Sequence, residues 1–271
     1  MDFMHALADT RDRNRSMLCV GLDPEPETFP ASLRESADAT FEFCRAIIDA
    51  TADLVCAFKP QIAHFAARGE ESALQRVIEY SHAEHPGVPV ILDAKRGDIG
   101  STAAYYAVEA FDRYKADAVT LNPYLGRDSA QPFLDRADKG VVLLCRTSNP
   151  GAADLQDLSV DGLPLYLRVA KLIANDWNGN GNCLLVTGAT WPDEIAQIRA
   201  LVGDMPLLVP GIGAQGGDVE AVVKNGQDAR GNGLLISSSR AILYASNGEN
   251  FADAARAAAS TLRDEINRYR N

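Results

Sequence analysis

The sequence has little of what marks secreted or membrane proteins. It contains only five cysteines in 271 residues, and no two of them form a C-x-x-C pair. Four of the five lie in apolar, strand-like runs, which is typical of buried free thiols in a reducing compartment. No apolar run approaches the roughly 20 residues that a membrane helix needs. The N-terminal segment, with Asp2, His5 and Asp9, has no apolar signal-peptide core, so a cytoplasmic location is the default expectation. The cysteines are Cys19, Cys44, Cys56, Cys145 and Cys183.

The sequence also lacks the residue spacing of a metal site. Its four histidines form no H-E-x-x-H or similar pattern, and we interpret all four as structural. Aromatic residues make up 7% of the chain, and we interpret Trp177 and Trp191 as packing residues. The net charge of −11 argues against a surface that coats nucleic acid, although it does not exclude a small anionic ligand in a local basic pocket. The histidines are His5, His64, His82 and His85.

Short apolar runs recur along the chain, and each is followed by a segment of helical length. Strands that alternate with helices imply parallel pairing and right-handed crossovers. Eight such units in about 250 residues are typical of a TIM barrel, so we predict an α/β fold in which residues 1–271 form a single (β/α)8 barrel domain. A doubly wound open sheet is the alternative, and the absence of an early glycine-rich turn weighs against it. The predicted strands are Met17–Leu22, Leu54–Phe58, Val88–Leu92, Ala118–Leu121, Val141–Cys145, Cys183–Val186, Leu207–Val209 and Leu234–Ile236.

Helical patterns fill most of the segments between these runs. The last of them, Phe251–Arg268, is rich in alanine and is expected to close the outer ring of helices. The longest irregular stretch is 147–162, which we interpret as a loop on the active face or a lid. The other predicted helices include Ala39–Ala50, Glu71–Ala83, Ala103–Tyr114, Leu163–Trp177 and Glu194–Leu201.

A charged stretch follows the third predicted strand and precedes a helix expected to begin near Gly100. Side chains alternate along a strand, so Asp93 and Lys95 project the same way from its end. Asp98 and Thr102 are spaced i, i+4 and share a face if the helix includes both. A solvated turn with a helix cap is the simpler interpretation. However, the charges alternate in sign and lie at the carboxyl end of a buried strand, where α/β folds bind ligands. The charged residues are Asp93, Lys95, Arg96 and Asp98.

Polar residues also follow the other predicted strands. Any one of them, taken alone, is explained by a solvated loop. In a barrel, however, all these strand ends converge on one mouth, which favours a functional site there. The residues are Asp23, Lys59, Asn122, Arg146, Thr147, Ser148, Thr187 and the run Ser237–Arg240.

A glycine-rich segment, 210–218, follows the seventh predicted strand. Its glycines at 211, 213 and 216 formally satisfy G-x-G-x-x-G, but a dinucleotide site would place this motif near the start of a βαβ unit. Barrels frequently bind phosphate with the loops after strands seven and eight, so a phosphate-binding turn is the better interpretation. Arg240, after the eighth strand, would add a bidentate contact. The alternative for Arg240 is a surface arginine at a helix start.

The run from Asp93 to Thr102, D-A-K-R-G-D-I-G-S-T, resembles the D-x-K-x-x-D-I-x-x-T signature of the orotidine 5′-phosphate decarboxylase family. Its K-R-G-D form is similar to the bacterial subgroup often called type 2. The D-x-K-x-x-D core alone is shared with other phosphosugar decarboxylases and synthases, but together with Lys59 and the G-A-Q-G-G loop it is specific. The resemblance covers nearly the whole chain, through Leu18–Pro24, Phe58–Pro60, Thr147–Gly151, Pro210–Asp218 and Ser237–Arg240.

This resemblance implies an enzyme that converts orotidine 5′-monophosphate to uridine 5′-monophosphate, the last step of de novo pyrimidine biosynthesis, without a cofactor or a metal. It implies that Lys95 protonates C6 of the pyrimidine within a charged array formed by Lys59, Asp93, Lys95 and Asp98. Known members are homodimers with composite sites, in which Asp98 and Thr102 reach the neighbouring subunit's substrate. The implied substrate contacts are Asp23 and Lys59 to the ribose, Ser148 to the pyrimidine, and Gln215 and Arg240 to the 5′-phosphate.

Two other functions stay open at this point. A metal-dependent phosphosugar decarboxylase or aldol-type synthase would need an acid on the second strand to hold Mg²⁺, where this sequence has Lys59. A non-catalytic nucleotide- or phosphate-binding barrel would need Arg240 and the glycine-rich loop. It would have no use for Lys95 flanked by two aspartates.

Overall fold

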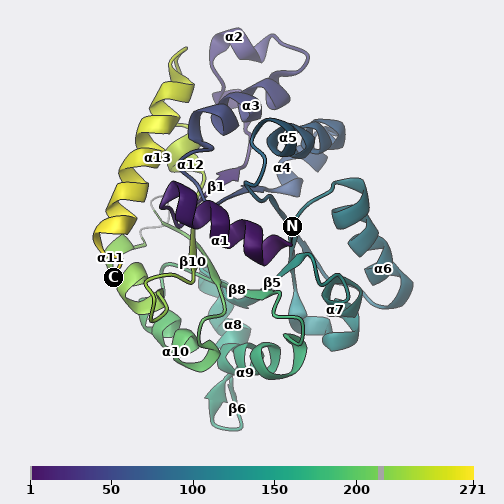
Figure 1. Cartoon of the computed structure of the whole chain (residues 1–271). Helices are drawn as coiled ribbons and strands as arrows, with labels where there is room; N and C mark the ends of the chain where they lie inside the picture. The colour runs from purple at the N-terminus through teal and green to yellow at the C-terminus, as the bar shows by residue number, and fades with distance from the viewer. Residues whose placement is uncertain (1, 213–216) are drawn as a thin grey trace.

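The computed structural model describes residues 2–212 and 217–271 and shows helices around a ring of parallel strands (Figure 1). The eight strands pair in the order β2-β1-β10-β9-β8-β5-β4-β3. Parallel bridges from Phe58 to Val90 and from Gln61 to Asp93 join β2 to the β3 side of the sheet. The predicted (β/α)8 barrel is therefore confirmed. Its strands are β1 Leu18–Leu22, β2 Ala57–Pro60, β3 Ile91–Arg96, β4 Ala118–Leu121, β5 Gly140–Arg146, β8 Cys183–Thr187, β9 Leu207–Pro210 and β10 Leu234–Ser238.

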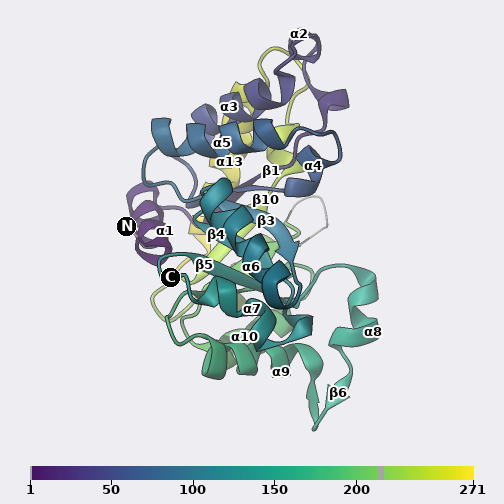
Figure 2. The same ribbon diagram turned by 90° about the vertical axis from the view of Figure 1, so that its right-hand side faces the viewer.

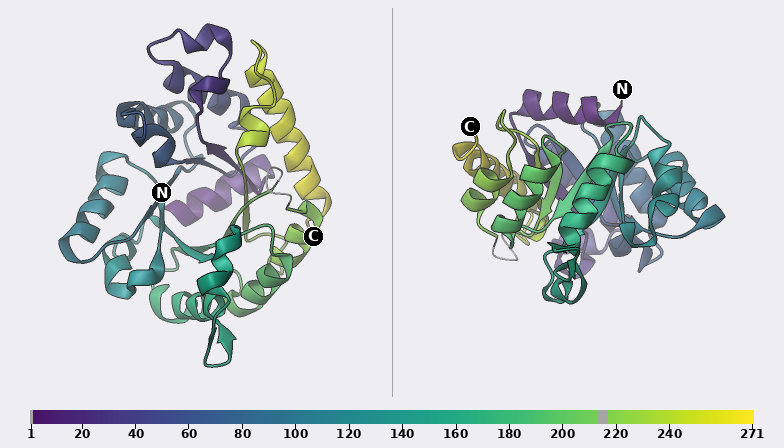
Figure 3. Two further views of the ribbon diagram at one scale, coloured as in Figure 1. Left: turned by 180° about the vertical axis from the view of Figure 1, so that it is seen from behind. Right: turned by 90° about the horizontal axis from the view of Figure 1, so that it is seen from below.

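The helices surround the strands, and short elements mark the two opposite ends of the barrel. Figure 2 shows α1 at one end, and α8 with the hairpin β6–β7 (Ser159–Val160 and Leu163–Pro164) at the other. The left view of Figure 3 shows the ring from behind, with α1 lying across the far end. No helix of the described residues is long and apolar enough to span a bilayer. The helices are α1 Phe3–Asn14, α2 Ala31–Arg34, α3 Ala39–Thr51, α4 Ile62–Ala66, α5 Glu71–Glu84, α6 Gly100–Val108, α7 Arg127–Leu134, α8 Ala153–Gln156, α9 Leu165–Leu172, α10 Pro192–Val202, α11 Val219–Gly226, α12 Arg240–Leu243 and α13 Phe251–Arg268.

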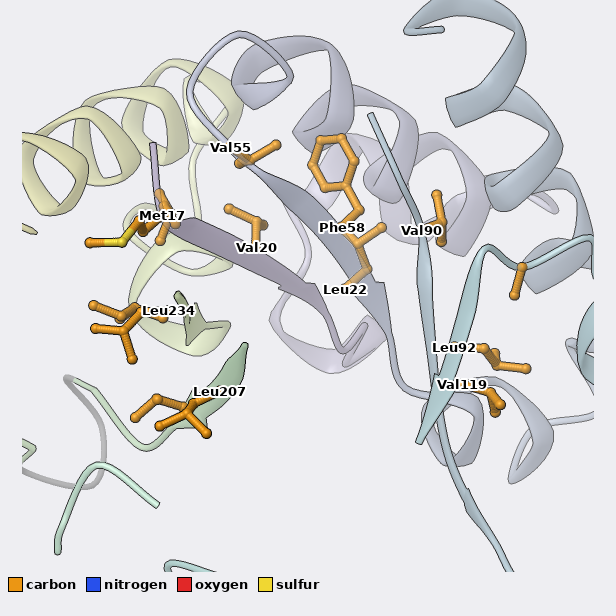
Figure 4. Packing of buried hydrophobic residues seen from close by; sticks show 14 of the residues in the cluster. Met17, Val20, Leu22, Val55, Phe58, Val90, Leu92, Val119, Leu207 and Leu234 are labelled. Atoms are coloured by element: carbon orange, nitrogen blue, oxygen red, sulfur yellow. The ribbon is translucent and has the colours of Figure 1, made fainter. Parts of the chain in front are cut away.

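Strand side chains separate into two apolar layers because they alternate between the two faces of the sheet. The outward residues, such as Val20, Phe58 and Val90, belong to the large cluster that the surrounding helices cover (Figure 4). The inward residues form a second, smaller cluster inside the barrel, which includes Ala57, Ile91, Ala118, Val142, Leu184, Leu208 and Leu235. Residues two positions further along each strand therefore also face the interior, closer to the mouth.

The N-terminal helix α1, which the sequence analysis does not predict, closes the amino end of the barrel. The Oδ1 atom of Asp2 caps it by accepting a hydrogen bond from the His5 amide at 2.9 Å. Phe3 and Leu7 belong to the inner apolar cluster. A Cβ atom on Gly140 would lie 2.4 Å from the Phe3 ring, so glycine at the start of β5 makes room for this plug.

The elements differ from the sequence-based prediction in several other places. The predicted helix Leu163–Trp177 begins only at Leu165, because Leu163 and Pro164 form the second strand of the hairpin. The second strand of the barrel spans Ala57–Pro60 rather than Leu54–Phe58. β3 continues through Arg96 rather than ending at Leu92, so Asp93 and Lys95 lie on the strand itself. The stretch 147–162 is not wholly irregular, since it contains a 3-10 turn, α8 and the first strand of the hairpin. In contrast, α6 begins at Gly100 and α13 spans Phe251–Arg268, as predicted.

Candidate active site

Three charged side chains meet at the carboxyl end of β2 and β3. Lys59 Nζ donates to Asp93 Oδ2 at 2.8 Å, and Lys95 Nζ donates to Asp93 Oδ1 at 2.6 Å. Thr120 Oγ donates to the same Oδ1 at 2.9 Å. The structure thus brings together the predicted Lys59, Asp93 and Lys95, and it adds Thr120, which the sequence analysis missed.

Strand alternation explains why these residues share one space. Lys59 lies two residues after the inward Ala57, and Thr120 lies two residues after the inward Ala118. Asp93 follows the inward Ile91 by the same spacing. The alternation that places Thr120 inside the barrel is therefore visible in the sequence. Its contact with Asp93, however, depends on the register between β3 and β4.

The charges of this cluster stabilise one another. Burial favours the neutral form of the Asp93 carboxyl, but the ammonium groups of Lys59 and Lys95 outweigh burial and hold the pKa of Asp93 well below its usual range. Burial likewise opposes the charge of Lys59, but the carboxylates of Asp93 and Asp23 prevail and raise the pKa of Lys59 above its ordinary value. The site therefore holds a buried ion pair that stays charged at neutral pH.

Lys95 differs from Lys59 in exposure and backbone conformation. The side chain of Lys95 is 47% exposed, whereas that of Lys59 is 7% exposed. Lys95 also has a φ of 45°, in the left-handed region that non-glycine residues rarely adopt. Its amide and that of Ala94 both donate to Thr120 Oγ, at 2.9 and 3.0 Å. Strain of this kind costs about 1–3 kcal/mol and is concentrated at functional sites.

Asp23 lies beyond the end of β1 and leaves one carboxylate oxygen available. Its Oδ1 atom is buried and has no hydrogen-bond partner among residues 2–212 and 217–271. The carboxylate is near enough to Lys59 to raise the pKa of that ammonium. A buried acceptor without a partner is costly, so this oxygen is suited to accept a hydrogen bond from a ligand hydroxyl.

A cavity of about 530 Å³ opens beside Lys95. Ser148 lines it from the loop after β5, and Pro210 lines it from the end of β9. Leu144 and Val186 supply apolar wall. A pocket with apolar walls and a few convergent polar groups is typical of a small-molecule site.

Other predicted site residues lie apart from this cluster. Asp98 precedes α6, so the helix includes Thr102 but not Asp98, and the condition for the two to share a helix face is not met. The Oδ1 of Asp98 accepts a hydrogen bond from the Ile99 amide at 2.8 Å, and Thr102 is exposed on α6. Arg240 is exposed at the first residue of α12. Gln215 lies outside the described residues.

The acidic and histidine side chains of the described segments form no cluster of three or more suited to a metal ion. Three histidines instead pair with a single carboxylate each. His5 Nδ1 lies 2.6 Å from Asp2 Oδ2, His82 Nε2 lies 2.8 Å from Asp117 Oδ2, and His85 Nε2 lies 2.8 Å from Asp49 Oδ1. On β2, the position where a Mg²⁺-dependent relative would need an acid carries Lys59.

Comparisons with known proteins agree on one family. Residues 16–255 match the model of the family described as "Orotidine 5′-phosphate decarboxylase / HUMPS family". The chain is 67% identical over 270 residues to the orotidine 5′-phosphate decarboxylase of Azoarcus sp. (strain BH72), with 100% of both chains covered. Among solved structures, it is similar to Leishmania donovani OMP decarboxylase, at 42% identity and a TM-score of 0.87, with 99% of each chain covered. Leishmania donovani UMP synthase is 43% identical with a TM-score of 0.89, covering 99% of this chain and 56% of that one.

Proposed function

The chain belongs to the orotidine 5′-phosphate decarboxylase family and is a carboxy-lyase, and we propose that it converts orotidine 5′-monophosphate to uridine 5′-monophosphate without a cofactor. The observation that carries the proposal is the buried carboxylate of Asp93 held between the ammonium groups of Lys59 and Lys95. A half-exposed ammonium beside a small-molecule cavity is suited to stabilise a carbanion and then to protonate it.

In this mechanism, loss of carbon dioxide leaves a pair of electrons on C6 of the pyrimidine, and no ring position delocalises them well. Lys95 provides a positive charge beside that carbon and transfers its proton to it. Asp93 keeps the ammonium in place through the 2.6 Å hydrogen bond. It also faces the substrate carboxylate, and their repulsion disfavours the ground state.

One lysine does not supply the whole barrier reduction. A single preorganised donor contributes roughly 3–4 kcal/mol, whereas the slow uncatalysed reaction requires a reduction toward about 23 kcal/mol. We propose that remote contacts to the 5′-phosphate, made by Gln215 and Arg240, supply much of the remainder by closing the loops over the substrate.

Three further side chains are proposed to contact the substrate. Asp23, with its unpartnered oxygen, accepts from a ribose hydroxyl, and Lys59 donates to the ribose from the neighbouring strand. Ser148 contacts the pyrimidine, because it lines the same cavity as Lys95.

We further propose a homodimer with composite sites. Asp98 and Thr102 lie outside the cluster of their own chain, and large apolar side chains are exposed around them. Such exposure favours a protein contact. In the dimer, Asp98 and Thr102 of one chain reach the substrate of the other. The exposed residues are Ile99, Tyr105, Val108, Tyr124 and Leu125, which are 61%, 74%, 46%, 78% and 45% exposed.

Two further proposals concern the domain organisation of the chain and its location in the cell. We propose that residues 1–271 fold as one domain, because α13 packs against β1 and α3 and so ties the last segment to the first strand. We also propose a cytoplasmic location, because all five cysteines are free and buried, as expected in a reducing compartment.

The direct test follows the loss of orotidine 5′-monophosphate absorbance. We expect the unmodified enzyme to consume this substrate at the same rate with and without a chelator, and Lys95→Ala to lose essentially all activity while keeping its fold. Lys115→Ala is a matched control. Lys115 is also exposed and also has a backbone conformation in the left-handed region, but it lies before β4, at the amino end of the barrel. Near-normal turnover by Lys95→Ala would remove Lys95 from the proton-donor role. Chelator-sensitive activity would favour the metal-dependent alternative.

A further inference from the structure

A buried arginine lies beneath the loop that carries Ser148. Arg146, the last residue of β5, is 1% exposed. Its guanidinium lies over the Trp191 ring, 4.3 Å from the ring centroid, in the arrangement of a cation–π contact. Its Nη2 lies 3.2 Å from Asp157 Oδ2, whose side chain is 44% exposed. Its Nε is buried and finds no hydrogen-bond partner within the described part of the chain.

Arg146 and two neighbouring side chains form hydrogen bonds with the carbonyl, the amide and the hydroxyl of Thr147. Arg146 Nη1 and Trp191 Nε1 both donate to the Thr147 carbonyl at 3.2 Å. Gln156, at the end of α8, accepts from the Thr147 amide at 2.8 Å and donates to its hydroxyl at 2.9 Å. Three side chains from three separate segments of the chain therefore fix the residue that immediately precedes Ser148.

A glycine supports Ser148 from below. A Cβ atom on Gly188 would lie 2.8 Å from the Cα, Cβ and N atoms of Ser148, so no larger residue fits without moving the loop. The Gly188 amide donates to the Arg146 carbonyl at 2.7 Å, which ties this support to the same network. Ser148 is thus clamped between the Arg146 network and the end of β8.

Stability alone is a poor explanation for this arginine. A buried guanidinium loses its hydration, and the only carboxylate paired with it in the described residues is the half-exposed one of Asp157. Replacing such a buried ion pair by apolar side chains of similar volume is often neutral or stabilising. What the arginine does provide is geometry, because its planar fork bonds to several fixed acceptors at once.

From these contacts we infer that Arg146, together with Trp191, is a positioning residue for Ser148. It acts through the Thr147 carbonyl and sets where the Ser148 side chain lies relative to Lys95, and so where the pyrimidine ring sits against the ammonium. This inference rests on the proposed function. A displacement of about 1 Å at such a contact can reduce the rate by about a hundredfold.

A double-mutant cycle tests this role. We expect Arg146→Met to lower kcat/KM for orotidine 5′-monophosphate by about tenfold or more, because Ser148 loses its set position. In a Ser148→Ala background the same change should cost no more than about twofold, because the contact that it positions is already absent. Trp191→Phe keeps an aromatic ring beside the guanidinium but removes the N–H donor and part of the ring surface. It should give a smaller loss with the same non-additivity.

Arg199→Met is the matched control. Arg199 is also a buried arginine, and it donates to the carbonyls of Gly226, Gly203, Met205 and Gly233 near the amino ends of the last strands. Its replacement should lower thermal stability and leave kcat/KM of the folded enzyme unchanged.

The outcomes distinguish a failure of the positioning role from a failure of the proposed function. If Arg146→Met lowers kcat/KM by the same factor in the unmodified enzyme and in the Ser148→Ala variant, the positioning role is overturned. If Arg146→Met fails to fold, Trp191→Phe alone decides, and its loss must again vanish in the Ser148→Ala background. Failure of the unmodified enzyme to decarboxylate the substrate would instead overturn the proposed function.

Discussion

Asp93 is the side chain on which the charge distribution of the site depends. It accepts hydrogen bonds from two ammonium groups and one hydroxyl, which come from three consecutive strands of the barrel. Measured over the whole residue, Asp93 is 6% exposed and the neighbouring Lys59 is 5% exposed. Two cations can lie this close in a buried site because a carboxylate separates them, so Asp93 is as important for stability as for chemistry.

We expect Asp93→Asn to lower the free energy of unfolding at pH 7 by about 3–5 kcal/mol, because it leaves the buried Lys59 ammonium without its carboxylate. The depressed pKa of Asp93 also predicts a pH dependence for the unmodified protein. The contribution of Asp93 is complete above the unfolded-state pKa of about 3.9 and is lost as pH falls through the lower, folded-state value. Urea denaturation at pH 7 measures the first effect, and a series that continues below pH 3 follows the second.

Asp38→Asn serves as the control for this experiment, because Asp38 pairs with Arg76 on the exposed surface. Surface pairs of this type contribute little to stability. If Asp93→Asn proves as stable as the Asp38 variant at pH 7, the buried pair does not depend on this carboxylate. The description of the site as one electrostatic unit would then fail.

A helix or strand is predictable from the sequence where its own residues carry the pattern that indicates it. Buried parallel strands are continuous apolar runs, so all eight are visible in the sequence. The helix at Gly100 and the last helix are also visible, from a change of period and a long alanine-rich pattern. β3 extends further than predicted because Asp93 and Lys95 are not typical strand residues. They are accommodated there because neighbouring strands supply their partners, and that information is not local.

The same distinction applies to the site. Asp93 and Lys95 do lie side by side, 2.6 Å apart. Simple alternation is not the reason, because the register of β3 shifts between Leu92 and Arg96 and Lys95 has a left-handed φ. The contacts of Thr120 with β3 and of Trp191 with the loop after β5 depend on strand register and loop packing. No spacing within the sequence reports these, so Trp191 is interpreted from sequence only as a packing residue.

The N-terminal helix α1 contributes to stability but lies far from the charged cluster of the site. Phe3 fills the amino end of the barrel against Gly140 and is 2% exposed. We expect Phe3→Ala to destabilise the protein by about 3–5 kcal/mol, since it opens a cavity in a packed core. Activity of the folded variant should be unchanged, because Lys95 lies at the opposite end of the strands.

Thermal or urea denaturation, combined with the decarboxylation assay, checks this prediction. Leu172→Ala is a suitable control, because Leu172 is 43% exposed on α9 and its truncation removes little packing. A fall in kcat for Phe3→Ala below its melting temperature would mean that the two ends of the barrel are coupled. In that case α1 would be more than a plug.

For the assembled protein, the decisive question is whether each site needs two chains. Lys95 is part of the charged cluster of its own chain, whereas Asp98 and Thr102 lie outside it on an exposed, partly apolar surface. If the dimer is composite, Lys95→Ala and Asp98→Ala subunits damage different components of the site. A heterodimer of the two then contains one intact site, with Lys95 from one subunit and Asp98 from the other.

Random mixing of equal amounts of these two variants should therefore restore about one quarter of the unmodified activity, since half of the dimers are heterodimers and half of their sites are intact. The subunits are given different affinity tags so that heterodimers can be purified and assayed. Asp98→Ala mixed with Thr102→Ala is the matched control, because both residues lie on the same loop and helix start and no combination of these subunits contains an intact site. If Asp98 acted within its own chain, neither mixture would recover. Recovery in the first mixture alone is therefore the result that requires a shared site, and its absence in purified heterodimers would exclude one.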